Sequence, residues 1–134
     1  MIVIKNKLIP FGDYDSINLF GILFTKTNMD KIDINHESIH TEQIIDCIVI
    51  GIIIVSILKL IFGISGLWVL LSPITFYILY GLEYICIRLF HKKQNDAYHD
   101  VSFEEEAYNN QEDLDYTKYR EMFTWIKYIK LKSN

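Results

Sequence analysis

Two long apolar stretches, residues 44–62 and 67–90, restrict the folds that this chain can adopt. The first would form about 28 Å of helix, which matches the roughly 30 Å hydrocarbon core of a bilayer. The second is of similar length, and membrane helices tolerate a kink such as the one that we expect at Pro73. With the turn-prone residues 63–66 between them, the stretches predict a helical hairpin inserted in a membrane at about residues 44–90. The alternative is a helical pair buried in the core of a soluble oligomer, which the scarcity of charges in both stretches disfavours.

The composition of the flanks indicates the orientation of the hairpin and argues against other classes of protein. The 134 residues fit a single domain, residues 1–134, and include 13 Lys and Arg, of which all but Lys59 lie outside the tip of the hairpin. The positive-inside rule then predicts cytoplasmic termini, in an inner or plasma membrane. The net charge of −4, concentrated in residues 96–115, argues against a nucleic-acid partner. Two cysteines are too few for a disulfide scaffold or a four-cysteine zinc site.

Four charged residues lie near one end of the predicted hairpin. Folding the chain about residues 63–66 places Asp46 opposite Glu83, and Glu42 near Arg88. Acidic residues at membrane depth are costly and normally have a partner or water. We therefore expect a salt-bridged collar where the hairpin leaves the bilayer, and a role in catalysis or proton transfer is the alternative.

The N-terminal part of the chain predicts a β-hairpin followed by a helix. Residues 1–10 and 16–26 are rich in Ile, Val, Leu and Phe, partly in alternation, and the turn-like sequence FGDYDS lies between their apolar parts. Asp30 and Asp33 are rival N-caps of the helix that follows. No strong breaker occurs before about Phe62, so this helix should continue directly into the first apolar stretch.

The sequence HESIH lies on this expected helix. It places His36 and His40 four residues apart, so that both imidazoles project from one face and can hold one Zn²⁺. Glu37 would then lie beside a water molecule on the metal, where a carboxylate acts as a general base. The pattern therefore predicts a zinc site in which water is activated. The alternatives are a chance match and a purely structural pair of histidines.

A catalytic zinc site needs a third protein ligand, and the candidate is the segment SFEEEAYNNQ. Ser102 and Glu105 form a capping-box pattern, so a helix should begin here. On that helix Glu104 shares a face with the small residue Ala107, which would let the helix lie close to the metal helix. Glu106 lies on another face and is the rival third ligand. The acidic run could instead be an ordinary first turn that complements the helix dipole.

The two motifs together resemble the gluzincin branch of zinc metallopeptidases, in particular its integral-membrane members, and the whole chain resembles a group of small bacterial integral-membrane proteins. The resemblance implies that His36, His40 and Glu104 are ligands of Zn²⁺ and that Glu37 is the catalytic base. It also implies that a strand at about residues 17–25 pairs with an extended peptide substrate. Many of those membrane enzymes have Asp after the Ala of the second motif, where this chain has Tyr108.

We therefore expect an α+β membrane protein: an N-terminal β-hairpin, a motif helix that continues into a two-helix transmembrane hairpin, and C-terminal helices that carry the third ligand. The predicted function is hydrolysis of peptide bonds in a peptide or membrane-protein substrate by a membrane-anchored zinc endopeptidase. One alternative is a non-enzymatic membrane protein with structural or sensory zinc, in which a fourth ligand such as Glu106 or His99 closes the site. Another is a membrane interaction partner with an accidental motif. Candidates for stabilising an oxyanion are Tyr98, His99, Tyr108, Tyr116 and Tyr119.

Overall fold

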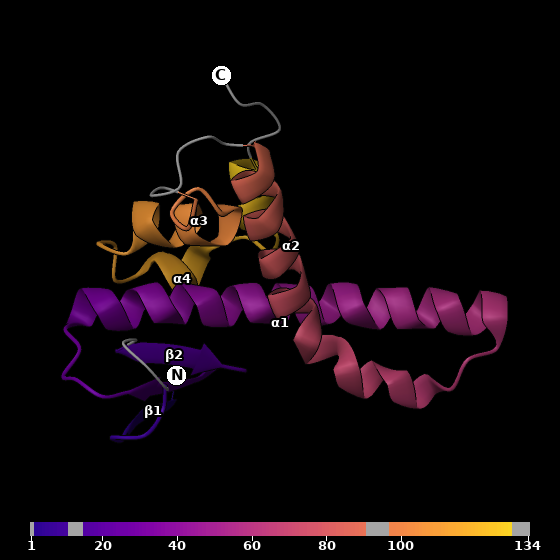
Figure 1. Ribbon diagram of the computed structural model, residues 1–134, viewed down its shortest axis with the longest axis horizontal. Helices are drawn as coiled ribbons and strands as arrows, with labels where there is room; N and C mark the ends of the chain where they lie inside the picture. The colour runs from indigo at the N-terminus through magenta and orange to yellow at the C-terminus, as the bar shows by residue number, and fades with distance from the viewer. Residues whose placement is uncertain (1, 11–14, 91–96, 130–134) are drawn as a thin grey trace.

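The computed structural model describes residues 2–10, 15–90 and 97–129, and it has a mixed α+β fold arranged around one long helix (Figure 1). The helix α1 (Lys31–Phe62) forms the long axis. The strands lie on one side of its N-terminal half, and α3 (Ser102–Asn110) and α4 (Tyr116–Tyr119) lie on the other side. The C-terminal half of α1 projects beyond both layers.

The small sheet has three strands, β1 (Ile2–Lys5), β2 (Ser16–Leu19) and β3 (Ile22–Thr25), in the order β1-β3-β2. The hairpin is formed by β2 and β3, and β1 pairs with β3 in parallel. The predicted pairing of residues 1–10 with 16–26 as a hairpin was therefore wrong. The reason is a two-residue turn in which Phe20 and Gly21 both have positive φ, at 54° and 84°, and Phe20 gives no turn signal in the sequence.

The helix α1 begins and ends near the predicted residues. Asp30 is the N-cap, and its side chain accepts hydrogen bonds from the backbone N–H groups of Ile32 and Asp33. The Asp33 carboxylate reaches back to the N–H of Asp30, so the two rival N-caps form one reciprocal capping box. At the other end, Gly63 adopts the left-handed conformation that terminates many helices.

The second apolar stretch consists of two helical parts with a break at Pro73. The first part, η1 (Gly66–Ile74), is a 3₁₀ helix that runs back along the projecting half of α1, and α2 (Thr75–Phe90) then crosses α1 and leads away from it (Figure 1). The approach is close at Gly51, because a Cβ atom at this position would lie only 2.9 Å from Ser72 Cα. The expected kink at Pro73 is thus a change of helix type and direction.

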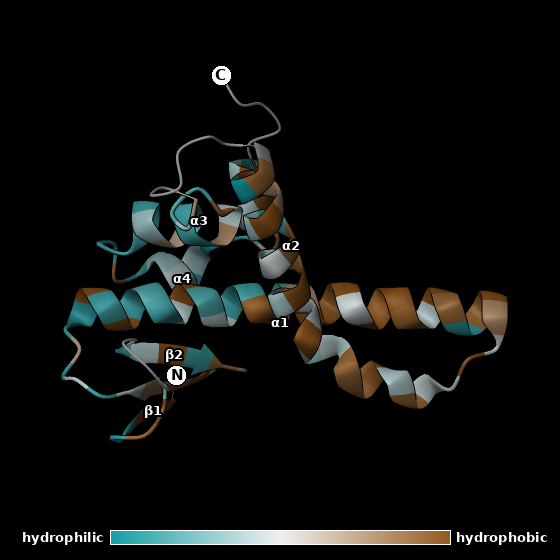
Figure 2. Cartoon of the chain, in the orientation of Figure 1, coloured by the Kyte–Doolittle hydropathy of each residue, from teal (hydrophilic) through white to brown (hydrophobic). Residues whose placement is uncertain are grey.

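Two helical segments, Lys31–Phe62 and Gly66–Leu89, are long and apolar enough to cross a membrane. In the most apolar 18-residue stretch of each segment, only 22% and 11% of the residues, respectively, are buried inside the protein. The core helix of a soluble protein, in contrast, is mostly buried. The projecting half of α1 is almost uniformly hydrophobic, and the half beside the sheet is mostly hydrophilic (Figure 2).

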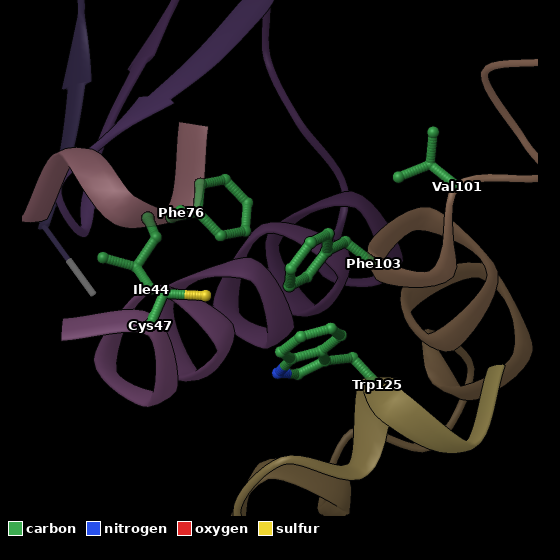
Figure 3. Packing of buried hydrophobic residues seen from close by; sticks show 6 residues of the cluster. All are labelled: Ile44, Cys47, Phe76, Val101, Phe103 and Trp125. Carbon is green, nitrogen blue, oxygen red and sulfur yellow. The ribbon is translucent and has the colours of Figure 1, made fainter. Parts of the chain in front are cut away.

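A compact cluster of buried side chains holds α3 against α1 (Figure 3). Phe103 packs on Trp125 of η2 (Thr124–Tyr128) with 4.4 Å between ring centroids, and it contacts Phe76 of α2 edge to face. The cluster also includes Ile44, Cys47 and Val101. It therefore joins α1, α2, α3 and η2 at the point where the polar half of α1 meets its apolar half.

The charged residues near this point have partners other than those expected. Asp46 accepts hydrogen bonds from Arg120 and from the backbone of Phe123, both at 2.9 Å. Glu83 accepts hydrogen bonds from the N–H and hydroxyl groups of Ser102 at 3.0 and 2.7 Å. The expected collar with Asp46 opposite Glu83 was therefore wrong. The predicted capping box at Ser102 was wrong as well. Val101 is the N-cap of α3, and the Glu83 carboxylate of α2 binds the first turn of this helix instead.

Candidate metal centre

Three side chains from α1 and α3 meet at a point that is shielded from solvent. His36 Nε2 and His40 Nε2 are 3.1 Å apart, and they lie 3.3 and 3.4 Å from the two carboxylate oxygens of Glu104. Within residues 2–10, 15–90 and 97–129, this is the one group of three His, Cys, Asp or Glu side chains whose ligand atoms could surround a metal ion. All of these atoms lie within 4.8 Å of one another.

The packing of α3 against α1 brings Glu104 to the histidines. Ala107 is fully buried and forms a small cluster with Ile39 and Tyr116, so the two helices approach closely at this point. One turn earlier on α3, Glu104 faces His36 and His40. The expectation that a small residue shares a face with the third candidate ligand agrees with this arrangement.

The side-chain amide of Gln43 determines which nitrogen of His40 carries a proton. Gln43 Nε2 donates to Phe103 O and to a Glu106 carboxylate oxygen, both at 2.9 Å, so the amide oxygen must point toward His40. This oxygen lies 2.7 Å from His40 Nδ1. An amide oxygen can only accept, so Nδ1 is the donor and Nε2 is the atom that faces the centre. Burial lowers the pKa of His40, but contacts with Glu104 outweigh it and raise this pKa to about 9, so without a metal ion Nε2 carries a proton toward Glu104 at neutral pH.

His36 is held in a similar way by residues of α3 and its C-cap. Its Nδ1 lies 3.0 Å from the side-chain oxygen of Gln111, and the ring of Tyr108 contacts the imidazole edge to face with 4.6 Å between centroids. Tyr108 follows Ala107, at the position where the resemblance to membrane metallopeptidases would place Asp. In this chain Gln111 provides the polar contact to the ring, and Tyr108 packs against it.

The donor set fits a divalent metal ion of the zinc class. When both imidazoles are neutral and protonated on Nδ1, their Nε2 atoms and the carboxylate are all acceptors, and Glu104 Oε2 is buried without a hydrogen-bond partner among the described residues. Such acceptors repel one another unless a cation lies between them, either a proton or a metal ion. Ligand atoms at the usual bond lengths from a tetrahedral zinc ion lie roughly 3.3 Å apart. The two Nε2 atoms are separated by 3.1 Å, close to this value, and each lies at a similar distance, 3.3 or 3.4 Å, from a different Glu104 oxygen.

Glu104 remains ionised despite its burial. Burial by itself raises the pKa of the carboxyl, but contacts from the His36 and His40 imidazoles outweigh it and hold the pKa below its ordinary value. Tyr80 Oη donates a hydrogen bond to Glu104 Oε1 at 3.0 Å. Tyr98 also hydrogen-bonds to Glu104, and burial together with this negative charge raises the pKa of its phenol. Tyr98 therefore stays protonated at neutral pH, and its single O–H is directed at Glu104.

Glu37 lies between two cavities of different character. A mostly apolar cavity of about 650 Å³ is lined by Glu37, His40 and Glu104 together with residues of β2 and α2. A more polar cavity of about 310 Å³ is lined by Glu37, His36 and Gln111. The hydroxyl group of Ser16 lies 3.4 Å from a Glu37 carboxylate oxygen. The carboxylate can thus contact molecules in either cavity.

Several other residues proposed from the sequence lie away from the candidate ligands. Glu106 faces Gln43, Tyr116 and Arg120, and neither it nor His99 belongs to the ligand group formed by the described residues. Tyr116 donates to Glu106, and Tyr119 donates to Asp113. Of the phenols proposed for an oxyanion, Tyr98 lines both cavities and Tyr108 lines the polar one.

Sequence reasoning missed Gln43, Gln111 and Tyr80 as polar partners of the candidate ligands. Gln43 had a local signal, since it lies three residues after His40 on the same face of α1. Gln111 lies on the helix face that was assigned to Glu104 and Ala107. Tyr80 gave no signal, because its approach to Glu104 depends on where α2 crosses α1.

Comparison with known proteins found no similar protein. No family model matches the chain, and neither a curated protein nor a solved structure matches it at a significant level.

Proposed function

We propose that the protein is a membrane-anchored, zinc-dependent endopeptidase whose ligands are His36, His40 and Glu104. The observation that carries the proposal is the convergence of three candidate ligands on one point, beside a cavity that His40, Glu104 and Glu37 line. Three protein ligands leave the fourth tetrahedral position for water or substrate, as catalytic zinc sites require.

When bound, a zinc ion would supply a Lewis acid that polarises a carbonyl group and lowers the pKa of a water molecule. Glu37 takes a proton from the attacking water and later delivers it to the leaving amine, so that one carboxylate serves as base and then as acid. Tyr98, protonated and lining the same cavity, redirects its O–H from Glu104 to the carbonyl oxygen as negative charge develops there. Glu104 stays ionised and balances charge at the centre.

The cavity suggests an extended peptide with apolar side chains as the substrate. Strand β2 is an edge strand of the described sheet and lines the larger cavity along its whole length. An edge strand can add a peptide by backbone hydrogen bonds. Tyr77 donates to the backbone oxygen of Asn18 at 3.1 Å, so this end of the strand already has a partner, and the Ser16 end nearer Glu37 is the place for a peptide.

The test of the proposed function combines metal analysis with a cleavage assay. Protein purified in lipid nanodiscs should contain zinc close to one equivalent and should cleave members of a mixed peptide library, with products identified by mass spectrometry. Removal of zinc by a chelator should stop cleavage, and added zinc should restore it. Cleavage that persists without metal would overturn the proposal. Stoichiometric zinc without any cleavage would favour the alternative of a structural or sensory metal.

The proposal also includes insertion of residues 44–90 in an inner or plasma membrane. The exposed apolar residues of α1, η1 and α2 support it. We expect the protein to pellet with membranes and to resist carbonate extraction, because burying this much apolar surface in lipid outweighs the cost of Lys59. Reporters fused to either terminus should be cytoplasmic. Recovery in the soluble fraction without detergent would contradict insertion, and a reporter on the outer side would contradict the orientation.

A further inference from the structure

A buried network of charges lies behind the candidate metal centre. Glu106 is completely buried, and one of its oxygens accepts hydrogen bonds from Tyr116 Oη at 3.0 Å and from Arg120 Nε at 2.6 Å. The other oxygen accepts from Arg120 at 3.1 Å and from Gln43 Nε2 at 2.9 Å. Arg120 also donates to Asp46 at 2.9 Å. The network therefore connects α1 and α3 through one guanidinium group.

The network fixes the direction of the Gln43 amide. In the observed orientation both N–H groups of Gln43 meet acceptors, namely Phe103 O and Glu106 Oε2. Rotating the amide by 180° would place its oxygen against these two acceptors and its nitrogen against His40 Nδ1. A hydrogen bond to a charged acceptor is about twice as strong as one between neutral groups, so the Glu106 carboxylate favours the observed orientation.

We infer that Glu106, held by Arg120, is a positioning residue for the metal centre: it orients Gln43, which keeps His40 in the tautomer with Nδ1 protonated and Nε2 free for a metal. This inference rests on the proposed function, because it concerns the same metal site. It gives Glu106, the alternative candidate for the third ligand, a positioning role in place of metal binding. Glu106 acts on the centre through two hydrogen bonds and does not touch it.

The informative variant is Glu106→Gln. The new side chain has one acceptor where the carboxylate had two, and the charge of Arg120 takes that acceptor. Its NH₂ group then faces the NH₂ group of Gln43, so the amide of Gln43 loses its preference and the Nε2–H tautomer of His40 becomes populated. Because loss of a polar partner of a metal-bound histidine weakens metal binding about 10–100-fold, zinc affinity should fall by a factor in this range.

The experiment uses full-length protein in nanodiscs, with two readouts. In metal-free protein above the titration range of the histidines, ¹⁵N NMR should show protonated Nδ1 on His40 in the wild type and a shift toward Nε2–H in Glu106→Gln. The His36 signal is the internal control, since its partner Gln111 has no hydrogen bond to Glu106 among the described residues. An unchanged His40 tautomer would overturn the inference, and this readout needs neither zinc nor peptidase activity.

The second readout is zinc affinity in a double-mutant cycle with Gln43→Met. If Glu106 acts through Gln43, Glu106→Gln should have almost no further effect on zinc affinity once Gln43 is Met. Equal losses in both backgrounds would show that Glu106 acts independently and would overturn the inference. If the wild type bound no zinc, the proposed function would fail while the tautomer measurement still decided the role of Glu106. If Gln43→Met failed to fold, Gln43→Asn, too short to reach His40, would replace it. If Glu106→Gln failed to fold, Glu106→Asp, whose shorter side chain draws the carboxylate away from Gln43, would replace it.

Discussion

Glu37→Gln is expected to retain zinc and the fold but to lose peptide hydrolysis by about 10²–10⁴-fold, the usual contribution of a general acid–base group. The amide preserves the shape of the side chain between the two cavities but cannot accept a proton from water at neutral pH. Zinc should remain, because Glu37 is not in the group formed by His36, His40 and Glu104. Cleavage products and bound metal are measured on the same nanodisc samples.

The matched control for this variant is Glu42→Gln. Glu42 lies on the same helix and undergoes the same chemical change, but it is absent from the lining of both cavities. Its activity should equal that of the wild type. If Glu37→Gln and the wild type gave the same products, or if zinc were lost with Glu37, the proposed mechanism would be wrong and a structural metal would become the better explanation.

Loss of the third candidate ligand is the second large effect that we expect. Glu104→Ala should weaken zinc binding by more than the roughly 100-fold that the loss of a hydrogen-bonding partner can cause, since a carboxylate 3.3 and 3.4 Å from the two imidazoles is removed. His36→Ala and His40→Ala should have similar effects. Affinity is measured by competition with a chelator of known strength.

Glu106→Ala serves as the contrast, because it should act on folding. Removing Glu106 leaves Arg120 buried with half of its partners, and breaking a buried ion pair typically costs about 3–5 kcal/mol of stability. The midpoint of chemical unfolding should therefore fall more for Glu106→Ala than for Glu104→Ala. If folded Glu106→Ala protein lost more zinc than Glu104→Ala, the third ligand would have to be reassigned.

Features that depend on near neighbours in the chain could be read from the sequence. Helix periodicity placed His36 and His40 on one face and gave Glu104 the face of Ala107, and the structure brings these faces together. The extent of α1 followed from a capping residue, a long run without breakers and a terminal glycine. The role of these residues in catalysis stays a prediction.

Features that depend on contacts between distant segments were decided only by the tertiary structure. The parallel pairing of β1 with β3 and the capping of α3 by Glu83 join residues that share no local pattern. Gln43 and Glu106 are 63 positions apart, and only the close packing at Ala107 brings them into contact. The sequence thus determined which side chains could hold a metal. The packing of α3 on α1 decided that the Glu104 carboxylate faces the histidines and that the Glu106 carboxylate binds Gln43 behind them. The physical reason is that an ionised group buried between helices needs a cation or a hydrogen-bond donor beside it, and only the fold determines which one is there.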